Sequence, residues 1–177
     1  MKKIKFVLFA CLLMFGVKAS AQFRSKEKVI HLGIGTNQFY FQKGFPFTAA
    51  FEYGFSKWVS GGAGLDLIPG NVTQGYYSYT YIGVCPAARF SVHLAQIDVR
   101  WLDLYFGATG GANQFITSVN QSDRPSAIKD RSYFAAYFGA HFNIKKAFGL
   151  FAEASAGTGL TSNARIGIAL TVGGEEE

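Results

Sequence analysis

Cysteine, proline and charged residues are all scarce in this chain, and no long apolar run follows its first twenty residues. Two cysteines in 177 residues exclude a disulfide-stapled scaffold and a cysteine-rich zinc site. Charged residues are 16% of the chain, against roughly a quarter in an average soluble domain, which argues against a disordered module. A membrane-spanning helix needs about 18 consecutive apolar residues, so a helical membrane protein is also excluded.

Aromatic residues and glycine are abundant instead. The chain has 18 Phe, 9 Tyr and 21 Gly, and its length allows one domain. This composition favours many β-strands that carry bulky rings on one face and small residues on the other.

The first residues have the features of an export signal. A basic start with Lys2, Lys3 and Lys5 precedes an apolar stretch, and Ala19-Ser20-Ala21 supplies the small residues of a cleavage site. We predict a signal peptide over residues 1–21, cleaved before Gln22; the alternative is lipidation at Cys11.

Much of the positive charge lies in this segment. Removing its four lysines from the 17 basic residues leaves 13 against 11 acidic ones, so the formal charge falls from +6 to +2. The remaining chain has no Lys/Arg stripe, and we expect no nucleic-acid partner.

A period-two alternation predicts the strands. Phe47, Ala49 and Phe51 alternate with Thr48, Ala50 and Glu52, which gives a strand with two chemically distinct faces. The same split indicates eight strands, over residues 30–35, 45–55, 59–67, 81–92, 102–109, 133–142, 150–157 and 165–172.

The expected connections differ in length. Residues 56–58 and 143–149 are short, whereas 68–80 and 110–132 are long and polar, and 93–101 is longer than a tight turn. Short periplasmic turns and longer outer loops are typical of transmembrane barrels. We therefore predict an all-β fold, an eight-stranded antiparallel up-and-down transmembrane barrel over residues 22–172, followed by an acidic periplasmic tail over 173–177.

Charge decides which face meets lipid. The apolar face contains no Asp, Glu, Lys, Arg or His, and a basic group at the midplane of a bilayer costs about 2–4 kcal/mol. The interior of an eight-stranded barrel is just wide enough for side chains, and buried charges must be paired. We therefore predict a plugged lumen in which Arg89 and Arg165 pair with some of the acidic residues of a polar network: Glu52, Asp66, Arg89, Asp103, Glu153 and Arg165.

Aromatic residues support a bilayer, because rings such as Tyr79, Tyr81, Trp58 and Trp101 fall at strand ends, where interfacial girdles lie. One alternative stays open: a soluble periplasmic lipocalin-like barrel that encloses an apolar ligand.

Candidate catalytic residues are few. His31 and His141 are placed in the lumen and His93 in a periplasmic turn, and no serine partner is fixed by spacing. We expect all three histidines to be satisfied by neighbours, Cys85 to be a small buried residue, and the carboxylates to form salt bridges rather than a metal site. We predict no catalysis, no cofactor and no open pore; a barrel enzyme that modifies outer-leaflet lipid is the second alternative.

The long connection 110–132 is the third of the expected outer connections along the chain. Its residues 112–131 carry several cations. Arg124, Lys129 and Arg131 are candidates to contact lipopolysaccharide phosphates or an external partner. The other expectation is a solvated, mobile loop.

The chain resembles the small outer membrane β-barrel proteins of the OmpA/OmpX-like type. The resemblance rests on the signal ending Ala19-Ser20-Ala21-Gln22, the eight two-faced strands, and the segments 104–108, 149–153 and 165–170. It implies location in the bacterial outer membrane, insertion by the barrel-assembly machinery, contact with outer membrane lipids and a monomeric state. It implies an envelope-structural or surface-interaction role. One departure is the end of the chain, where Val172 precedes Gly173, Gly174 and three glutamates instead of a terminal aromatic residue.

Overall fold

The described part of the computed structural model forms one closed antiparallel barrel of eight strands in sequential order. It covers residues 25–36, 45–74, 77–94, 101–117, 131–145, 147–158 and 164–173. The strands are β1 (Lys28–Thr36), β2 (Phe47–Gly54), β3 (Val59–Gln74), β4 (Tyr77–His93), β5 (Leu102–Thr117), β6 (Arg131–Lys145), β7 (Phe148–Gly157) and β8 (Ala164–Val172). The predicted fold class is confirmed.

The barrel closes between the first strand and the last. Lys28 of β1 pairs with Val172 of β8, and Thr36 pairs with Ala164. The start of β1 and the end of β8 therefore lie at the same end, together with residues 55–58 between β2 and β3 and Ala147 before β7. We call this the short-connection end, and the opposite one the far end.

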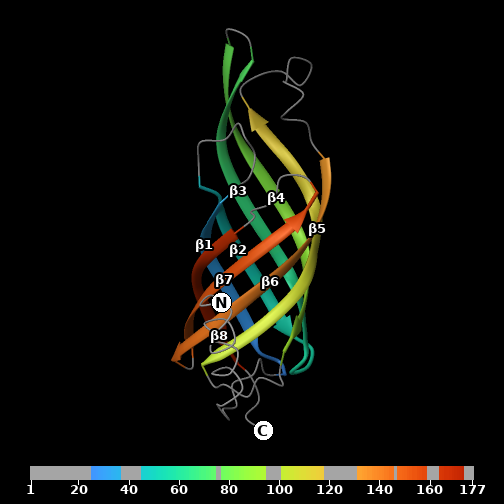
Figure 1. The fold of residues 1–177 in the computed structure, drawn as a ribbon, viewed down its shortest axis with the longest axis vertical. Coiled ribbons are helices and arrows are strands. Elements are labelled where there is room, and N and C mark those ends of the chain that lie inside the picture. Colours follow the sequence, from blue (N-terminus) through green and yellow to red (C-terminus); the bar gives the residue numbers. More distant parts are fainter. Residues whose placement is uncertain are drawn as a thin grey trace, which may run out of the picture.

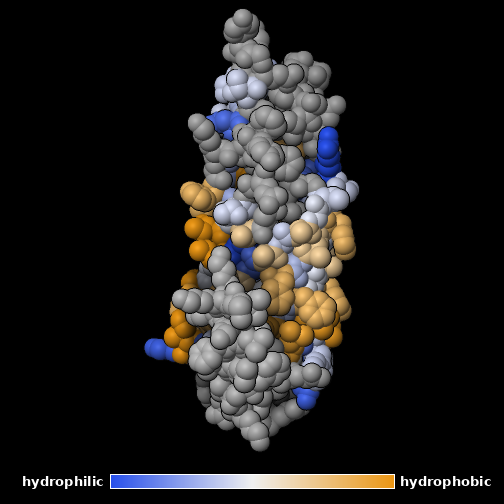
Figure 2. All heavy atoms as spheres, in the orientation of Figure 1, coloured by the Kyte–Doolittle hydropathy of each residue, from blue (hydrophilic) through white to orange (hydrophobic). Residues whose placement is uncertain are grey.

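Side chains alternate between the two faces as the registers predict. Phe47, Phe51 and Phe138 are 58%, 43% and 52% exposed, whereas Glu52 and Arg89 are 2% and 5% exposed. In Figure 2, hydrophobic side chains gather along both flanks of the barrel, with hydrophilic ones above and below. All carboxylates of the described residues lie inside, and most large apolar side chains at mid-strand positions lie outside.

The strands are not equally long, and here two expected loops are wrong. Residues 68–74 and 77–80 are the continuations of β3 and β4, which pair from Val59↔Val92 to Gln74↔Tyr77, and β5 continues through residues 110–117. Pro69, Gly70 and Asn71 are signals for a loop, but β3 continues past Leu67, which pairs with the first residue of β2, Phe47. A proline is tolerated at such a sheet edge because its missing N–H needs no partner there.

The barrel wall is therefore higher on one side. β1 and β8, with nine residues each, span about 30 Å along the strand, which at a tilt of about 40° gives about 23 Å of height and matches an apolar band of about 25 Å. β4, with 17 residues, reaches about 43 Å on the same arithmetic. The extra length of β3, β4 and β5 rises above the other strands at the far end (Figure 1).

Polarity changes along this extension. The outward positions of β3 run from Leu65 and Leu67 to Asn71 and Thr73, which are also exposed. On β4, Ser78 and Thr80 pair with these two polar residues and precede the apolar Ile82. On β3 and β4 the outward residues are polar beyond the level of Ile82, whereas Ile116 of β5, which pairs with Ile82, is still apolar and 63% exposed. The upper part of the β3–β4 extension therefore has the surface of a sheet in water.

No helix in the described ranges is long and apolar enough to cross a membrane.

Candidate functional site: a charged network inside the lumen

Arg89 is at the centre of the lumen. Its side chain projects inward from β4 and bonds two carboxylates: its Nε is 3.1 Å from Glu52 Oε1, and its Nη2 is 2.6 Å from Glu153 Oε2. The guanidinium carbon also lies 4.3 Å from the centroid of the Tyr137 ring. Arg89 thus links β2, β6 and β7 through the interior of the barrel.

Arg165 extends this network from β8. Its Nη1 is 3.1 Å from Glu153 Oε1 and its Nη2 is 2.7 Å from Asp66 Oδ2. Glu153 therefore accepts hydrogen bonds from both arginines. Side chains from five strands form one charge-paired group, which we call the lumen network: Glu52, Asp66, Arg89, Glu153 and Arg165.

The structure brings five of the six expected lumen residues together and places the sixth elsewhere. Asp103 is buried on β5 and pairs with His93, whose Nδ1 is 2.8 Å from Asp103 Oδ2. Of the expected loop contacts, Arg131 is the exposed first residue of β6, opposite Asn113. Arg124 and Lys129 lie outside the described residues.

His93 was expected in a turn, and this prediction is wrong. It is the last residue of β4, it points inward, and its side chain is 3% exposed. Its Nε2 is 2.9 Å from Ser60 Oγ, so Ser60, His93 and Asp103 are hydrogen-bonded in the order of a hydrolase triad. Sequence reasoning missed this set because its members lie on three strands, and only the register of β3, β4 and β5 brings them together.

The surroundings of Ser60 oppose nucleophilic catalysis. Ser60 is fully buried, and its Oγ donates to Glu52 Oε2 at 2.8 Å. A carboxylate at this distance would repel the oxyanion of a tetrahedral intermediate, where a hydrolase places hydrogen-bond donors. Ser91 donates to the same Glu52 oxygen, at 2.9 Å. The hydrogen-bonded set Ser60, His93 and Asp103 is therefore part of the polar packing of the lumen.

Two histidines lie apart from these hydrogen bonds. The rings of His31 and His141 are 5.9 Å apart, and His31 also packs on Phe151 at 4.7 Å. Both rings are buried in the lumen, as predicted. Neither Nε2 has a hydrogen-bond partner among the described residues, so the expectation that neighbours satisfy them is wrong for these atoms.

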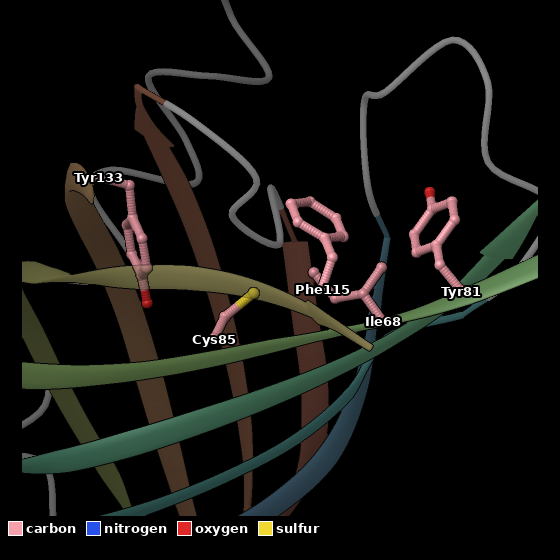
Figure 3. Close-up of a cluster of buried hydrophobic side chains, with 5 residues drawn as sticks. All are labelled: Ile68, Tyr81, Cys85, Phe115 and Tyr133. Carbon is pink, nitrogen blue, oxygen red and sulfur yellow. The ribbon is translucent and has the colours of Figure 1, made fainter. Parts of the chain in front are cut away.

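The lumen is apolar toward the far end. Ile68, Tyr81, Cys85, Phe115 and Tyr133 form a buried cluster from four strands, in which the Tyr81 and Phe115 rings are 5.5 Å apart. Figure 3 shows these side chains pointing into the enclosed space. Tyr81 is therefore not part of an interfacial girdle, and Tyr79 packs against the same cluster. Cys85 is 1% exposed, as a small buried residue would be.

The interior leaves little free space. A small cavity lies between the lumen network and this apolar cluster, lined by residues that include Asp66, Cys85, Tyr133 and Arg165. Within the described ranges, no three His, Cys, Asp or Glu side chains are grouped so that they could hold a metal ion.

Comparison with known proteins identifies the fold and leaves the sequence family open. No family model matches the chain, and no curated protein does. Among solved structures, the outer membrane protein OprG of Pseudomonas aeruginosa is 10% identical, with a TM-score of 0.59, over 87% of this chain and 99% of that one. The outer membrane protein Ail of Yersinia pestis, solved in a bilayer nanodisc, is 13% identical, with a TM-score of 0.54, over 84% of this chain and 100% of that one.

A de novo designed transmembrane β-barrel is also similar, at 13% identity and a TM-score of 0.51. These similarities fit an integral membrane barrel whose apolar belt faces outward and whose charges face inward. The chain has the fold of the small eight-stranded outer membrane barrels, as its resemblance to them implied.

Proposed function

We propose that this protein is a non-enzymatic, integral outer membrane barrel with a closed lumen, whose tall β3–β5 wall is a surface for contacts outside the cell. The observation that carries the proposal is the length of this wall, which exceeds the apolar belt and ends in polar outward residues such as Asn71 and Ser78.

The exposed apolar belt supports insertion in a membrane. Leu65, Phe106 and Phe138 are 38%, 47% and 52% exposed at mid-strand positions, and a soluble monomer rarely exposes a continuous apolar surface of this kind. The buried charges argue against the lipocalin-like alternative, because the interior of that barrel would be apolar.

The filled lumen supports the absence of a pore. Arg89 and Arg165 cross the interior with their carboxylates, and the aromatic cluster lies beyond them. The buried position of Ser60 beside Glu52 supports a role without catalysis.

Orientation and surface exposure are tested together by thiol labelling of intact cells. In a Cys85→Ser background, Ser78→Cys on the extension is expected to react with a membrane-impermeant maleimide. The matched variant Lys57→Cys, in the short β2–β3 connection, is expected to react only after the cells are opened. Labelling of Lys57→Cys alone in intact cells would reverse the assigned orientation.

Two further measurements test the membrane and pore assignments. Recovery of the protein from the outer membrane, with heat-modifiable migration on gels, is expected, and recovery from the soluble periplasm would reject the proposal. In planar bilayers we expect no large, stable conductance, and observing one would contradict the closed lumen.

A further inference from the structure

Charges of opposite sign are separated in this barrel. The five carboxylates of the described residues are all buried: Glu27, Glu52, Asp66, Asp103 and Glu153. The exposed charged side chains in the same ranges are all cations: Lys26, Lys28, Lys57, Arg131 and Lys145. The outer surface is therefore basic wherever its charge is described, even though the lumen network is acidic in sum.

Four of these cations lie at the short-connection end, including Lys26, which precedes β1 and bonds the end of β2 through its backbone N–H. Lys28 is the first residue of β1, Lys57 lies in the β2–β3 connection, and Lys145 is the last residue of β6. In an eight-stranded barrel these points lie on different sides of the circumference. We call Lys28, Lys57 and Lys145 the lysine girdle.

Aromatic rings place the girdle at the level of lipid headgroups. Trp58 and Trp101 are 39% and 53% exposed at this end, and Lys57 Nζ lies 6.0 Å from the centroid of the Trp58 ring. Tryptophan is enriched at the interface between hydrocarbon and headgroups, and lysine side chains there extend toward the polar layer. The Lys57 ammonium group is thus at the depth of phosphate groups, and Lys28 and Lys145 lie at the same end of the barrel.

We propose that the lysine girdle binds the phosphate groups of anionic phospholipids in the leaflet at the short-connection end. The proposal rests on the membrane location proposed above and names the lipid class that this end prefers. Charge complementarity carries it, because no exposed carboxylate accompanies the girdle in the described ranges. Basic side chains close to an anionic membrane surface are attracted strongly enough to select lipids.

The competing occupant is the acidic end of the chain. Glu175, Glu176 and Glu177 lie outside the described residues, three to five positions after Val172, which pairs with Lys28. If these carboxylates occupied the girdle, the lysines would not select lipids, so the experiment must separate the two.

Intrinsic fluorescence gives a local readout, because Trp58 and Trp101 are the two tryptophans of the chain. The full mature chain is refolded in phosphatidylcholine vesicles that contain 20% of a brominated lipid, either phosphatidylglycerol or phosphatidylcholine, with the bromines near the glycerol backbone. Bromine quenches tryptophan at close range. We expect the phosphatidylglycerol form to show an apparent association with the barrel about twofold to fivefold stronger, and high salt to reduce this preference.

Variants assign the effect to the girdle. The triple variant Lys28→Gln, Lys57→Gln, Lys145→Gln is expected to quench equally with both lipids. Arg131→Gln, which removes one cation from the far end, is expected to keep the wild-type preference. Equal quenching in the wild type, or an unchanged preference in the triple variant, would overturn the proposal.

A separate variant tests whether the acidic tail occupies the lysine girdle. The variant Glu175→Gln, Glu176→Gln, Glu177→Gln is expected to match the wild type. A preference that appears only in this variant would show that the tail occupies the girdle and would overturn the lipid assignment. Heat-modifiable migration of each sample separates a failure of insertion, which would count against the proposed function, from a lack of lipid selectivity.

Discussion

Arg89 on β4 and Glu153 on β7 meet across the lumen in a two-point ion pair, with Nη2–Oε2 and Nη1–Oε1 distances of 2.6 and 3.2 Å. Two strands that are not neighbours in the sheet are thus joined through the interior. The wall is closed by backbone hydrogen bonds between adjacent strands, and this ion pair adds a connection across the lumen.

Removing the arginine of this pair is expected to be costly. Arg89→Gln leaves Glu52 and Glu153 without their shared cation, and breaking a buried ion pair from one side typically costs about 3–5 kcal/mol. Urea unfolding in lipid vesicles measures the loss. The control Arg131→Gln removes an exposed arginine and is expected to change the free energy of unfolding by about 0.5 kcal/mol or less. Equal stability of the two variants would contradict the structural role of Arg89.

Ser60 is expected to stabilise the fold and to be unreactive. Ser60→Ala leaves Glu52 and His93 each without one buried hydrogen bond, which costs about 1–3 kcal/mol. The matched variant Ser78→Ala, on the exposed extension, is expected to have almost no effect. A fluorophosphonate probe is expected not to label the folded barrel, and labelling that disappears in Ser60→Ala would identify a nucleophile and contradict this prediction.

Alanine substitutions at two glycines of the β5–β6 pair are expected to differ sharply in their effect on the free energy of unfolding. A Cβ added at Gly139 would lie against the ring of Tyr105, its partner across the strands, whereas one added at Gly110 would have its nearest neighbours at 3.7 Å. We expect Gly139→Ala to lower the free energy of unfolding by about 1–3 kcal/mol because the lumen is overpacked. Gly110→Ala is expected to be neutral or slightly stabilising. Similar stabilities in urea unfolding would show that the Tyr105 ring moves aside.

The outward orientation of the apolar face of β6 can be tested by introducing a cation at two different depths in the membrane. Phe138→Arg introduces a cation in the middle of an outward face of β6 and is expected to cost about 2–4 kcal/mol in a bilayer. Ile144→Arg, near the end of the same strand, is expected to cost about 1 kcal/mol or less. Unfolding from vesicles gives both values, and a cost that does not depend on position would reject the membrane depth assigned to β6.

Alternation together with the distribution of charge was sufficient to predict which side of each strand faces the lumen. On β2, Thr48, Ala50 and Glu52 are buried, whereas Phe47 and Phe51 point outward. Because side chains alternate between the two faces of a strand, assigning one face to the lumen fixes the direction of every other side chain. The lengths of the strands were harder to predict from the sequence. Pro69 and Asn71 favour a loop in isolation, and pairing with β4 overrides that preference.

Partners across the barrel were not predictable in detail. The sequence indicates that arginines and carboxylates share the interior, but Arg89 and Glu153 are 64 positions apart, and their contact depends on how the barrel closes. His93 was missed for a related reason. Strand β4 continues to His93, and this one residue of extra length turns an expected turn residue into a lumen residue bonded to Ser60 and Asp103.

The bond between Arg165 and Asp66 joins the last strand to the third over 99 positions. Until β8 has docked beside β1, this guanidinium cannot reach that carboxylate, so completing the cylinder and pairing the charges of its interior are the same event. An assembly intermediate that lacks the final strand would hold an acidic, water-accessible cleft, and closing the barrel would convert it into a compact core in which each carboxylate of the lumen network has a cationic partner.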